Sequence, residues 1–502
     1  MGVLTVFVKP PLYLISSKGD FLPEKKEKKS VGQKLEESLS YKRKLIWEDA
    51  SKKEIKEIMD FAERYKEFLN KAKTERECIK EFVKFLESRG FRHISKIKRK
   101  PKAGTKIYDV NKEKNLAALV IGLSSPFEGM NMVASHVDAP RLDLKQLPLN
   151  EDSETGLAFF KTHYYGGLKK YQWVNIPLAL HGVVVRKDGT KVEIRLGEEK
   201  DEPVLTLPDL LPHLSRKKQG ERKLFEGIKG EEMNVLAGSL PYKDKKIKQK
   251  TKLAVLEYLN KKYGIVEEDF ISAELELVPA IEARDVGLDK SFVGAYGQDD
   301  RICAFTSLLA ISELDTPTKT ALALFLDKEE IGSEGATGVK SRFMENFVAR
   351  VLRLYDKNYH HTQLQACLEN SKALSADVNA GVNPTFKDVH DLTNASFIGK
   401  GIILTKYTGS GGKYMASDAS AEYVGEIRRL FNENKIPWQF GSLGKVDEGG
   451  GGTVAKFLAV YNMDIVDCGP GLLSMHSPYE ISSKADVYHT YRAYKVFFEK
   501  MK

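Results

Sequence analysis

Residues 320–333 read Thr-Ala-Leu-Ala-Leu-Phe-Leu-Asp-Lys-Glu-Glu-Ile-Gly-Ser. Residues 321–326 form a short, continuously apolar run, which is typical of a strand buried on both faces of a sheet. Two adjacent acidic residues, Glu329 and Glu330, follow this run and precede an isoleucine, a context that a solvated surface does not explain. Ligand sites in α/β folds lie at the carboxyl ends of strands. The stretch therefore predicts a buried strand that ends in a polar site.

The rest of the chain alternates between apolar runs and helical periodicity. Short apolar runs at residues 116–123 and 130–135 predict two more buried strands. Apolar residues at three- and four-residue spacing predict helices at residues 51–89, 301–314, 340–354, 421–432 and 484–502. Because strands and helices alternate, we expect an α/β fold with a mixed sheet flanked by helices.

A different pattern occupies residues 138–288. Residues 182–196 hold two alternating segments around Lys-Asp-Gly-Thr, which predicts a β-hairpin, and residues 273–278 alternate as a strand does. Residues 210–244 are polar and rich in Lys, Gly and Glu, which predicts a long exposed loop. This segment is therefore expected to form a β-rich domain inserted into the α/β fold.

The length of 502 residues corresponds to two to four domains at about 100–200 residues each. We expect one α/β domain formed by residues 31–137 and 289–502, with residues 138–288 inserted between its two parts. Residues 1–30 combine prolines with a run of Lys and Glu, which predicts an irregular lead.

Composition and charge exclude several classes of protein. The chain carries 79 basic and 70 acidic residues, a formal net charge of +9, without a basic motif interleaved with aromatic residues, so we expect no nucleic-acid partner. No apolar stretch approaches the ~20 residues of a membrane helix, so we expect no membrane partner. Four widely spaced cysteines predict reduced thiols, and the apolar run at residues 3–15 is interrupted by Lys-Pro-Pro, unlike a signal peptide. We therefore expect a cytoplasmic protein.

Several short stretches concentrate His, Asp and Glu at the ends of predicted strands or the start of a predicted helix. Their acidic and imidazole side chains are His136, Asp138, Asp299, Asp300, Glu329, Glu330, Asp377 and His476. Such nitrogen and oxygen ligands suit Zn²⁺, Mn²⁺ or Co²⁺. Each stretch also has a purely structural interpretation: His136 as a hydrogen-bonded histidine at a strand end, and Asp299 with Asp300 as the acidic first turn of a helix.

Taken in order, these stretches resemble the aspartyl aminopeptidase and vacuolar aminopeptidase family of dinuclear zinc exopeptidases. The resemblance runs from about residue 40 to the C-terminus, and its Glu-Glu-Ile-Gly-Ser and Met-His-Ser elements are specific when found together. It implies two zinc ions per subunit, with Co²⁺ or Mn²⁺ as possible substitutes. Asp299 is then expected to bridge the ions, His136 and Asp377 to complete one site, and Glu330 and His476 to complete the other.

The same resemblance implies a catalytic mechanism. Asp138 is expected to orient His136, and Glu329 to act as general base toward a water activated by the two metals. The expected activity is a metal-dependent aminopeptidase that hydrolyses the N-terminal residue of short peptides. The alternative is an amidohydrolase or deacylase of the same clan, which acts on a non-peptide amide.

The resemblance also implies an oligomer and points to substrate contacts. The inserted domain is expected to build homo-oligomers, namely dimers gathered into a tetrahedral dodecamer. The family carries a histidine in this insertion that reaches a neighbouring subunit's active site. Residues 165–173 read Tyr-Gly-Gly-Leu-Lys-Lys-Tyr-Gln-Trp without a histidine, so Lys169 or Lys170 is a candidate replacement. Lys406 and Thr453 are further candidates for substrate binding, and the preferred N-terminal residue, acidic or neutral, stays open.

Overall fold

The computed structural model describes residues 29–502, so most of the predicted irregular lead lies outside the described residues. Residues 44–502 form one compact unit, and the described residues before them belong to a separate one. In the latter, helix α1 (Val31–Leu39) begins after Ser30, whose hydroxyl accepts a hydrogen bond from the Gln33 backbone N–H, while the Gln33 side chain accepts one from the Ser30 N–H. This reciprocal pair is a capping box, which satisfies two amide donors at the helix start.

The main sheet has nine strands within the described residues, in the order β1-β2-β3-β13-β4-β14-β20-β16-β18. Its strands are β1 (Arg92–His93), β2 (Lys106–Asn111), β3 (Asn115–Val120), β4 (Met130–His136), β13 (Thr320–Leu326), β14 (Lys372–Ser375), β16 (Ile402–Thr405), β18 (Trp438–Phe440) and β20 (Asp464–Gly469). The neighbouring strands β13, β4, β14 and β20 run parallel, whereas β3 and β16 pair antiparallel to β13 and β20. The predicted mixed sheet is therefore confirmed, and four strands end at one edge.

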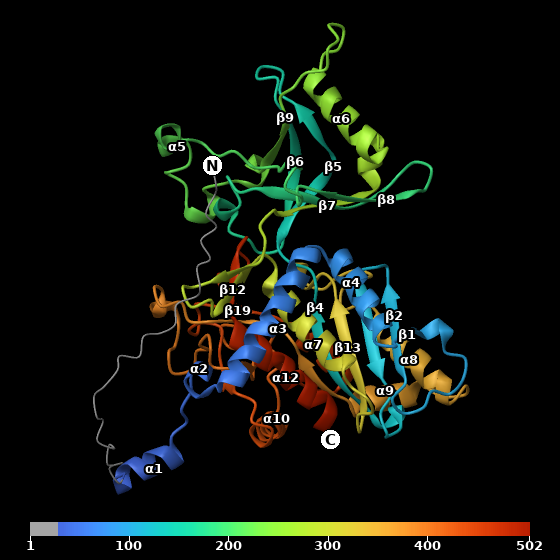
Figure 1. The fold of residues 1–502 in the computed structure, drawn as a ribbon, viewed down its shortest axis with the longest axis vertical. Coiled ribbons are helices and arrows are strands. Elements are labelled where there is room, and N and C mark those ends of the chain that lie inside the picture. The colour runs from blue at the N-terminus through green and yellow to red at the C-terminus, as the bar shows by residue number, and fades with distance from the viewer. Residues whose placement is uncertain (1–28) are drawn as a thin grey trace, which may run out of the picture. The chain divides into compact units, whose positions relative to one another are not determined.

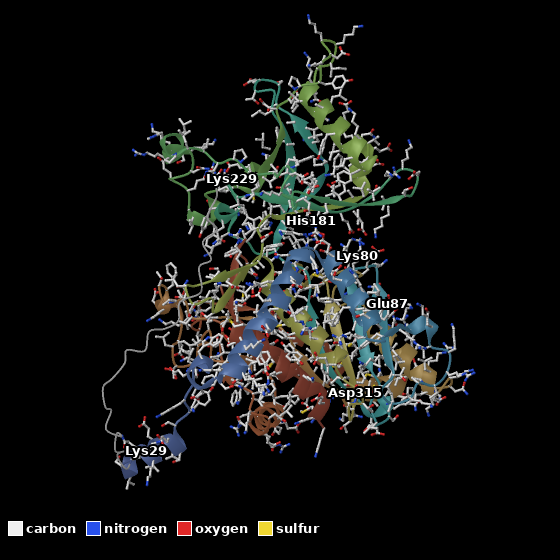
Figure 2. The ribbon with its side chains drawn as sticks, in the orientation of Figure 1. Lys29, Lys80, Glu87, His181, Lys229 and Asp315 are labelled. Atoms are coloured by element: carbon white, nitrogen blue, oxygen red, sulfur yellow. The ribbon has the colours of Figure 1, made fainter. Side chains whose placement is uncertain are left out.

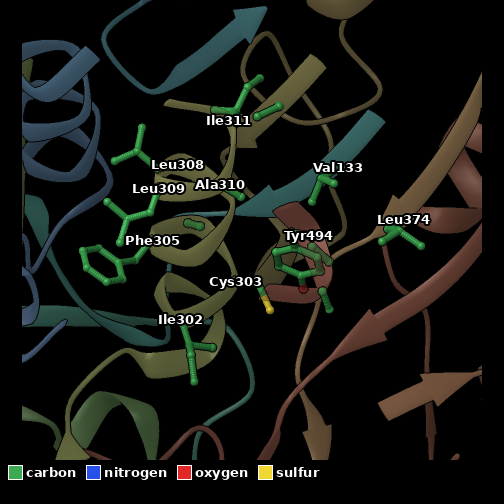
Figure 3. Close-up of a cluster of buried hydrophobic side chains, with 14 of the residues drawn as sticks. Val133, Ile302, Cys303, Phe305, Leu308, Leu309, Ala310, Ile311, Leu374 and Tyr494 are labelled. Carbon is green, nitrogen blue, oxygen red and sulfur yellow. The ribbon is translucent and has the colours of Figure 1, made fainter. Parts of the chain in front are cut away.

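Helices cover both faces of this sheet (Figure 1). They are α3 (Lys52–Lys71), α4 (Glu75–Ser88), α7 (Gln298–Ser312), α8 (Phe343–Tyr355), α9 (His361–Glu369), α10 (Ala421–Glu433), α11 (Ala455–Leu458) and α12 (Lys484–Lys500). Alternate side chains of β13 enter two different hydrophobic clusters, because successive residues of a strand point to opposite faces. Figure 3 shows part of one cluster, where Phe305 and Leu309 point to one side of α7 and Cys303 lies on its other side, beside Tyr494 of α12.

The prediction of a single helix at residues 51–89 is wrong in one respect, because this segment forms two helices, α3 and α4. The break lies at Ala72–Thr74, where Thr74 becomes the N-cap of α4 and its hydroxyl accepts a hydrogen bond from the Glu77 N–H. The Glu77 carboxylate accepts a hydrogen bond from the Thr74 N–H in return. A side chain that caps a new helix competes with continuation of the preceding one.

The inserted segment contains a separate antiparallel sheet in the order β8-β7-β10-β5-β6-β9. Its strands are β5 (Arg141–Glu151), β6 (Ala158–Tyr165), β7 (Leu178–Val185), β8 (Lys191–Leu196), β9 (Asn234–Gly238) and β10 (Ala273–Pro279), and α6 (Lys250–Tyr263) packs along it (Figure 1). The hairpin predicted at residues 182–196 is confirmed by the β7–β8 pairing. The predicted loop at 210–244 is wrong in part, since it contains α5 (Pro212–Lys218) and β9, whose buried Val235 anchors it to the core of this domain.

A buried histidine lies where the inserted sheet meets α4. His181 of β7, labelled in Figure 2, contacts Glu77 through Nδ1 at 2.8 Å and Glu198 through Nε2 at 3.0 Å. Burial lowers the pKa of His181, but its hydrogen bonds with the two glutamates outweigh burial and raise the pKa above its usual value. Through its contact with Glu77 of α4, this imidazole links the inserted sheet to the α/β domain.

A small third sheet, in the order β11-β12-β22-β21-β15, lies beside the carboxyl edge of the main sheet. Its strands are β11 (Arg284–Val286), β12 (Phe292–Ala295), β15 (Asn379–Ala380), β21 (Gly471–Leu473) and β22 (Glu480–Ser483). The turn between β21 and β22 carries the Met-His-Ser motif. No helix within residues 29–502 is both long enough and apolar enough to span a membrane.

Candidate metal centre

The carboxyl edge of the main sheet gathers the five predicted metal ligands. His136 is the last residue of β4, Asp377 follows β14 by two residues, and Glu330 lies in a short 3-10 turn after β13. Asp299 lies in the first turn of α7, and His476 comes from the turn between β21 and β22. Residues separated by up to 340 positions thus reach one place, and three of them do so because the parallel strands β4, β13 and β14 end at the same edge.

Asp299 occupies the middle of this group. Its Oδ1 lies 3.2 Å from His136 Nε2, and its Oδ2 lies 3.3 Å from His476 Nε2. His136 Nε2 is also 3.9 Å from Asp377 Oδ1, and His476 Nε2 is 3.5 Å from Glu330 Oε2. The five side chains therefore form two groups that share one carboxylate, each group having one imidazole nitrogen and a second carboxylate.

The donor atoms of this cluster fit divalent cations. His136, Asp299 and Glu330 each offer a ligand atom within 4.8 Å of the others. Asp299 Oδ1 and Glu330 Oε1 are buried and have no hydrogen-bond partner among the described residues. Burial raises the pKa of Glu330 and of Asp377, and nearby carboxylates raise both further. A cation offsets this clustering of negative charge, and imidazole with carboxylate oxygen is a ligand set of zinc.

The two imidazoles are oriented by their second nitrogen. His136 Nδ1 lies 3.0 Å from the backbone oxygen of Asp138 and 3.2 Å from its Oδ1. His476 Nδ1 lies 2.7 Å from the backbone oxygen of Gly167. Since each Nδ1 faces an acceptor, it carries the proton in the neutral ring, and the lone pair of Nε2 points toward the carboxylates.

Asp138 does more than orient an imidazole. Its fully buried carboxylate accepts hydrogen bonds from the backbone N–H groups of Glu329 and Glu330, each at 3.2 Å. Its Oδ2 also accepts the hydroxyl of Tyr165 at 2.9 Å. One carboxylate thus joins His136 to the turn that carries both glutamates. Sequence reasoning missed Tyr165, because an isolated tyrosine at the end of a strand carries no distinctive signal.

Glu480 is a second residue that sequence reasoning missed. Its side chain is 1% exposed, and its two oxygens accept the backbone N–H groups of Asp299 at 3.0 Å and of His476 at 2.8 Å. His476 has a φ of +63°, in the left-handed region that costs a non-glycine residue of order 1–3 kcal/mol. Glu480 therefore stabilises the strained turn that presents His476. An acidic residue four positions after the Met-His-Ser histidine was the available signal.

The predicted general base faces a cavity of about 370 Å³. Glu329, Thr453 and four of the five candidate ligands contribute to its lining, namely Asp299, Glu330, Asp377 and His476. Burial raises the pKa of Glu329 to about 7. A carboxylate with such a pKa exchanges protons efficiently near neutral pH.

The candidate substrate-binding residues lie in different places. Thr453 lines the cavity and donates its hydroxyl to Asp467 Oδ1 at 2.6 Å. Lys406 Nζ lies 3.1 Å from Asp418 Oδ1, with its side chain 44% exposed. Lys170 Nζ lies 5.2 Å from the centroid of the Tyr164 ring. Among residues 29–502, neither lysine is part of the cavity lining.

Known proteins are similar to this chain over most of its length. Residues 68–498 match the family model described as aminopeptidase I zinc metalloprotease (M18). A probable M18 family aminopeptidase 1 of Clostridium acetobutylicum is 48% identical over 457 residues, which cover 90% of this chain and 97% of that protein.

Solved structures show the same fold. The crystal structure of an M18 aminopeptidase from Thermotoga maritima has a TM-score of 0.88 and 46% identity, covering 92% of this chain and all of that one. A structure described as the yeast mApe1 dodecamer has a TM-score of 0.69 and 22% identity, covering 88% of this chain and 97% of that one. Because the family model and a relative at nearly half identity both span most of its length, this chain belongs to the M18 family of aminopeptidase I zinc metalloproteases.

Proposed function

We propose that this metallo-aminopeptidase removes the N-terminal residue of short peptides with two zinc ions held by His136, Asp299, Glu330, Asp377 and His476. The observation that carries the proposal is the position of Asp299, which directs one carboxylate oxygen toward each imidazole at 3.2 and 3.3 Å. A carboxylate placed in this way would offer one oxygen to each of two cations. Co²⁺ and Mn²⁺ accept the same donors and are expected substitutes.

The chain's own residues divide the remaining work. When bound by these residues, two divalent cations would polarise the scissile carbonyl and lower the pKa of the attacking water. Glu329, which lines the cavity beside the candidate ligands, would take a proton from the attacking water and deliver it to the departing amine. Asp138 keeps Glu329 in place through the backbone N–H contact at 3.2 Å. The cavity of about 370 Å³ receives the N-terminal side chain of the peptide.

Three residues are proposed to contact the substrate. Thr453 is supported by its place in the cavity wall, beside the buried carboxylate of Asp467. Lys406 and Lys170 remain predictions from the resemblance. Within the described residues, Lys170 does not line the cavity of its own chain. We therefore propose that it contacts the substrate in the cavity of a neighbouring subunit.

The proposed assembly is a homo-oligomer, a tetrahedral dodecamer in which the inserted domain forms contacts between subunits. The yeast relative described as a dodecamer supports it. So do large apolar side chains of the inserted domain that are 42–65% exposed in the single chain: Leu210, Leu211, Leu214, Leu224 and Phe225. Burial of such side chains favours association. Sedimentation near twelve times 56.5 kDa is expected, and sedimentation at the monomer mass contradicts the assembly.

We propose a cytoplasmic location, which is supported by the four cysteines. Each of Cys78, Cys303, Cys367 and Cys468 is a buried free thiol. Free thiols are typical of reducing compartments.

The activity is tested with metal-depleted protein. After EDTA treatment, hydrolysis of aminoacyl p-nitroanilides is expected to be lost and to return with Zn²⁺, Co²⁺ or Mn²⁺. The same anilides with an acetylated amine serve as the matched control, since an aminopeptidase requires the free α-amino group. Preferential hydrolysis of the acetyl amide, which releases acetate and leaves the anilide intact, identifies a deacylase-type amidohydrolase instead and refutes the proposal.

A further inference from the structure

The inserted domain reaches the metal centre at two points near the end of β6. Tyr165, the last residue of this strand, donates its hydroxyl to Asp138 Oδ2 at 2.9 Å. Two residues later, the backbone oxygen of Gly167 accepts His476 Nδ1 at 2.7 Å. We propose that Tyr165 is a positioning residue of the metal centre, through which metal affinity depends on the inserted domain. This inference rests on the proposed function of the site.

The hydroxyl completes the hydrogen bonding of a buried charge. The Asp138 carboxylate is fully buried, and the turn with Glu329 and Glu330 supplies one N–H donor to each of its oxygens. Tyr165 supplies the second donor to Oδ2. Without it, this oxygen keeps only the Glu330 N–H, and the carboxylate is held less firmly beside His136. Partners one shell beyond a metal ligand typically change metal affinity or activity 10- to 100-fold.

The ring of Tyr165 is itself held in position. The guanidinium carbon of Arg141 lies 3.8 Å from its centroid, a cation–π contact. Arg141 is buried and is fixed by Asp143 Oδ1 at 2.8 Å and Glu276 Oε2 at 3.1 Å from its Nε. The ring is 9% exposed. These contacts direct the hydroxyl at Asp138, so that the hydrogen bond requires little further loss of side-chain freedom.

The backbone after Tyr165 passes close to two predicted ligands, which is an independent observation. A Cβ atom at Gly166 would lie 3.3 Å from Glu330 Cβ and 3.4 Å from its Oε2, and the φ of +73° at Gly166 disfavours other residues. A Cβ atom at Gly167 would lie 3.4 Å from His476 Nδ1. The Gly-Gly pair therefore allows the inserted domain to approach the ligands of the second group as well.

The test is Tyr165→Phe in the full-length protein, with Tyr164→Phe as the matched control. Tyr164 precedes it in the same strand and is 41% exposed. We would measure zinc affinity by competition with a chelator, thermal unfolding of the metal-free protein, and kcat and KM for leucine p-nitroanilide. Tyr165→Phe is expected to bind zinc about tenfold more weakly and to lower kcat more than it raises KM. The metal-free unfolding temperature is expected to differ little from that of the control.

Zinc affinity equal to that of the wild type overturns the inference. It is also overturned if Tyr165→Phe destabilises the metal-free protein while zinc affinity is unchanged, because the hydroxyl then serves the fold and not the metal. A wild-type protein that binds no zinc refutes the proposed function and this inference together. A wild-type protein that binds zinc and cleaves peptides, beside a Tyr165→Phe variant that does both equally well, refutes the inference alone.

Discussion

Replacing Glu480 by glutamine tests how the metal centre is held together. The carboxylate accepts the N–H of Asp299 at 3.0 Å and that of His476 at 2.8 Å, one on each oxygen. Glutamine keeps the volume of the side chain but has one acceptor, and its NH₂ group then faces a backbone N–H. Glu480→Gln therefore releases one of the two predicted ligands without opening a cavity.

The size of the effect follows from these contacts. A hydrogen bond to a charged group contributes about 1.5–3 kcal/mol, and leaving a buried donor unpaired costs about 1–3 kcal/mol. We take roughly 2–4 kcal/mol for the variant, because the two contributions overlap. At about 1.4 kcal/mol per tenfold change, this sets an upper limit of roughly 30- to 1,000-fold on the weakening of zinc binding, because the metal-free protein loses the same contact. The strained φ of +63° at His476 favours relaxation of the turn once this contact is lost.

Zinc retained per chain during titration with a chelator measures this effect. Glu282→Gln is the matched control, because Glu282 is an exposed glutamate outside the cavity lining. Unfolding of the metal-free variant shows whether the change also destabilises the fold. If Glu480→Gln retains zinc within threefold of the wild type, the turn is held by other contacts and the reasoning is wrong.

Three further predictions concern the base, the substrate cavity and the pH dependence of stability. Glu329→Gln is expected to lower kcat by about 10²- to 10⁴-fold while zinc binding is preserved, because the side chain transfers a proton; unchanged peptide hydrolysis disproves its role. Thr453→Val removes the hydroxyl that donates to Asp467, so KM for leucine p-nitroanilide is expected to rise by about 3- to 10-fold with kcat retained. An unaltered KM shows that Thr453 does not contact the substrate. The raised pKa of His181 means that its protonated form stabilises the fold below about pH 6.5 and that this stabilisation is lost as pH rises through its folded pKa. Urea unfolding should therefore show the largest difference between wild type and His181→Gln at pH 5–6, and a difference that grows toward pH 9 contradicts the assignment.

The sequence by itself determined the fold class and the predicted ligand set. The apolar run at residues 320–326 and the acidic pair after it are local patterns, and the structure places them as β13 and the turn at its carboxyl end. Burial on both faces of a parallel sheet requires an unbroken apolar run, which is visible without any knowledge of partners. The helices are likewise visible in the sequence, through the spacing of their apolar residues. They begin or end within a few residues of their predicted bounds.

Only the tertiary structure decided which residues support the ligands. Tyr165 meets Asp138 across 27 positions, and Glu480 meets Asp299 across 181. Such contacts arise from the packing of the inserted domain and the small third sheet against the main sheet edge, and no local periodicity encodes them. A hydrogen-bond partner is recognised by where its donor or acceptor lies in space, whereas a strand or helix is recognised by the spacing of its own apolar residues.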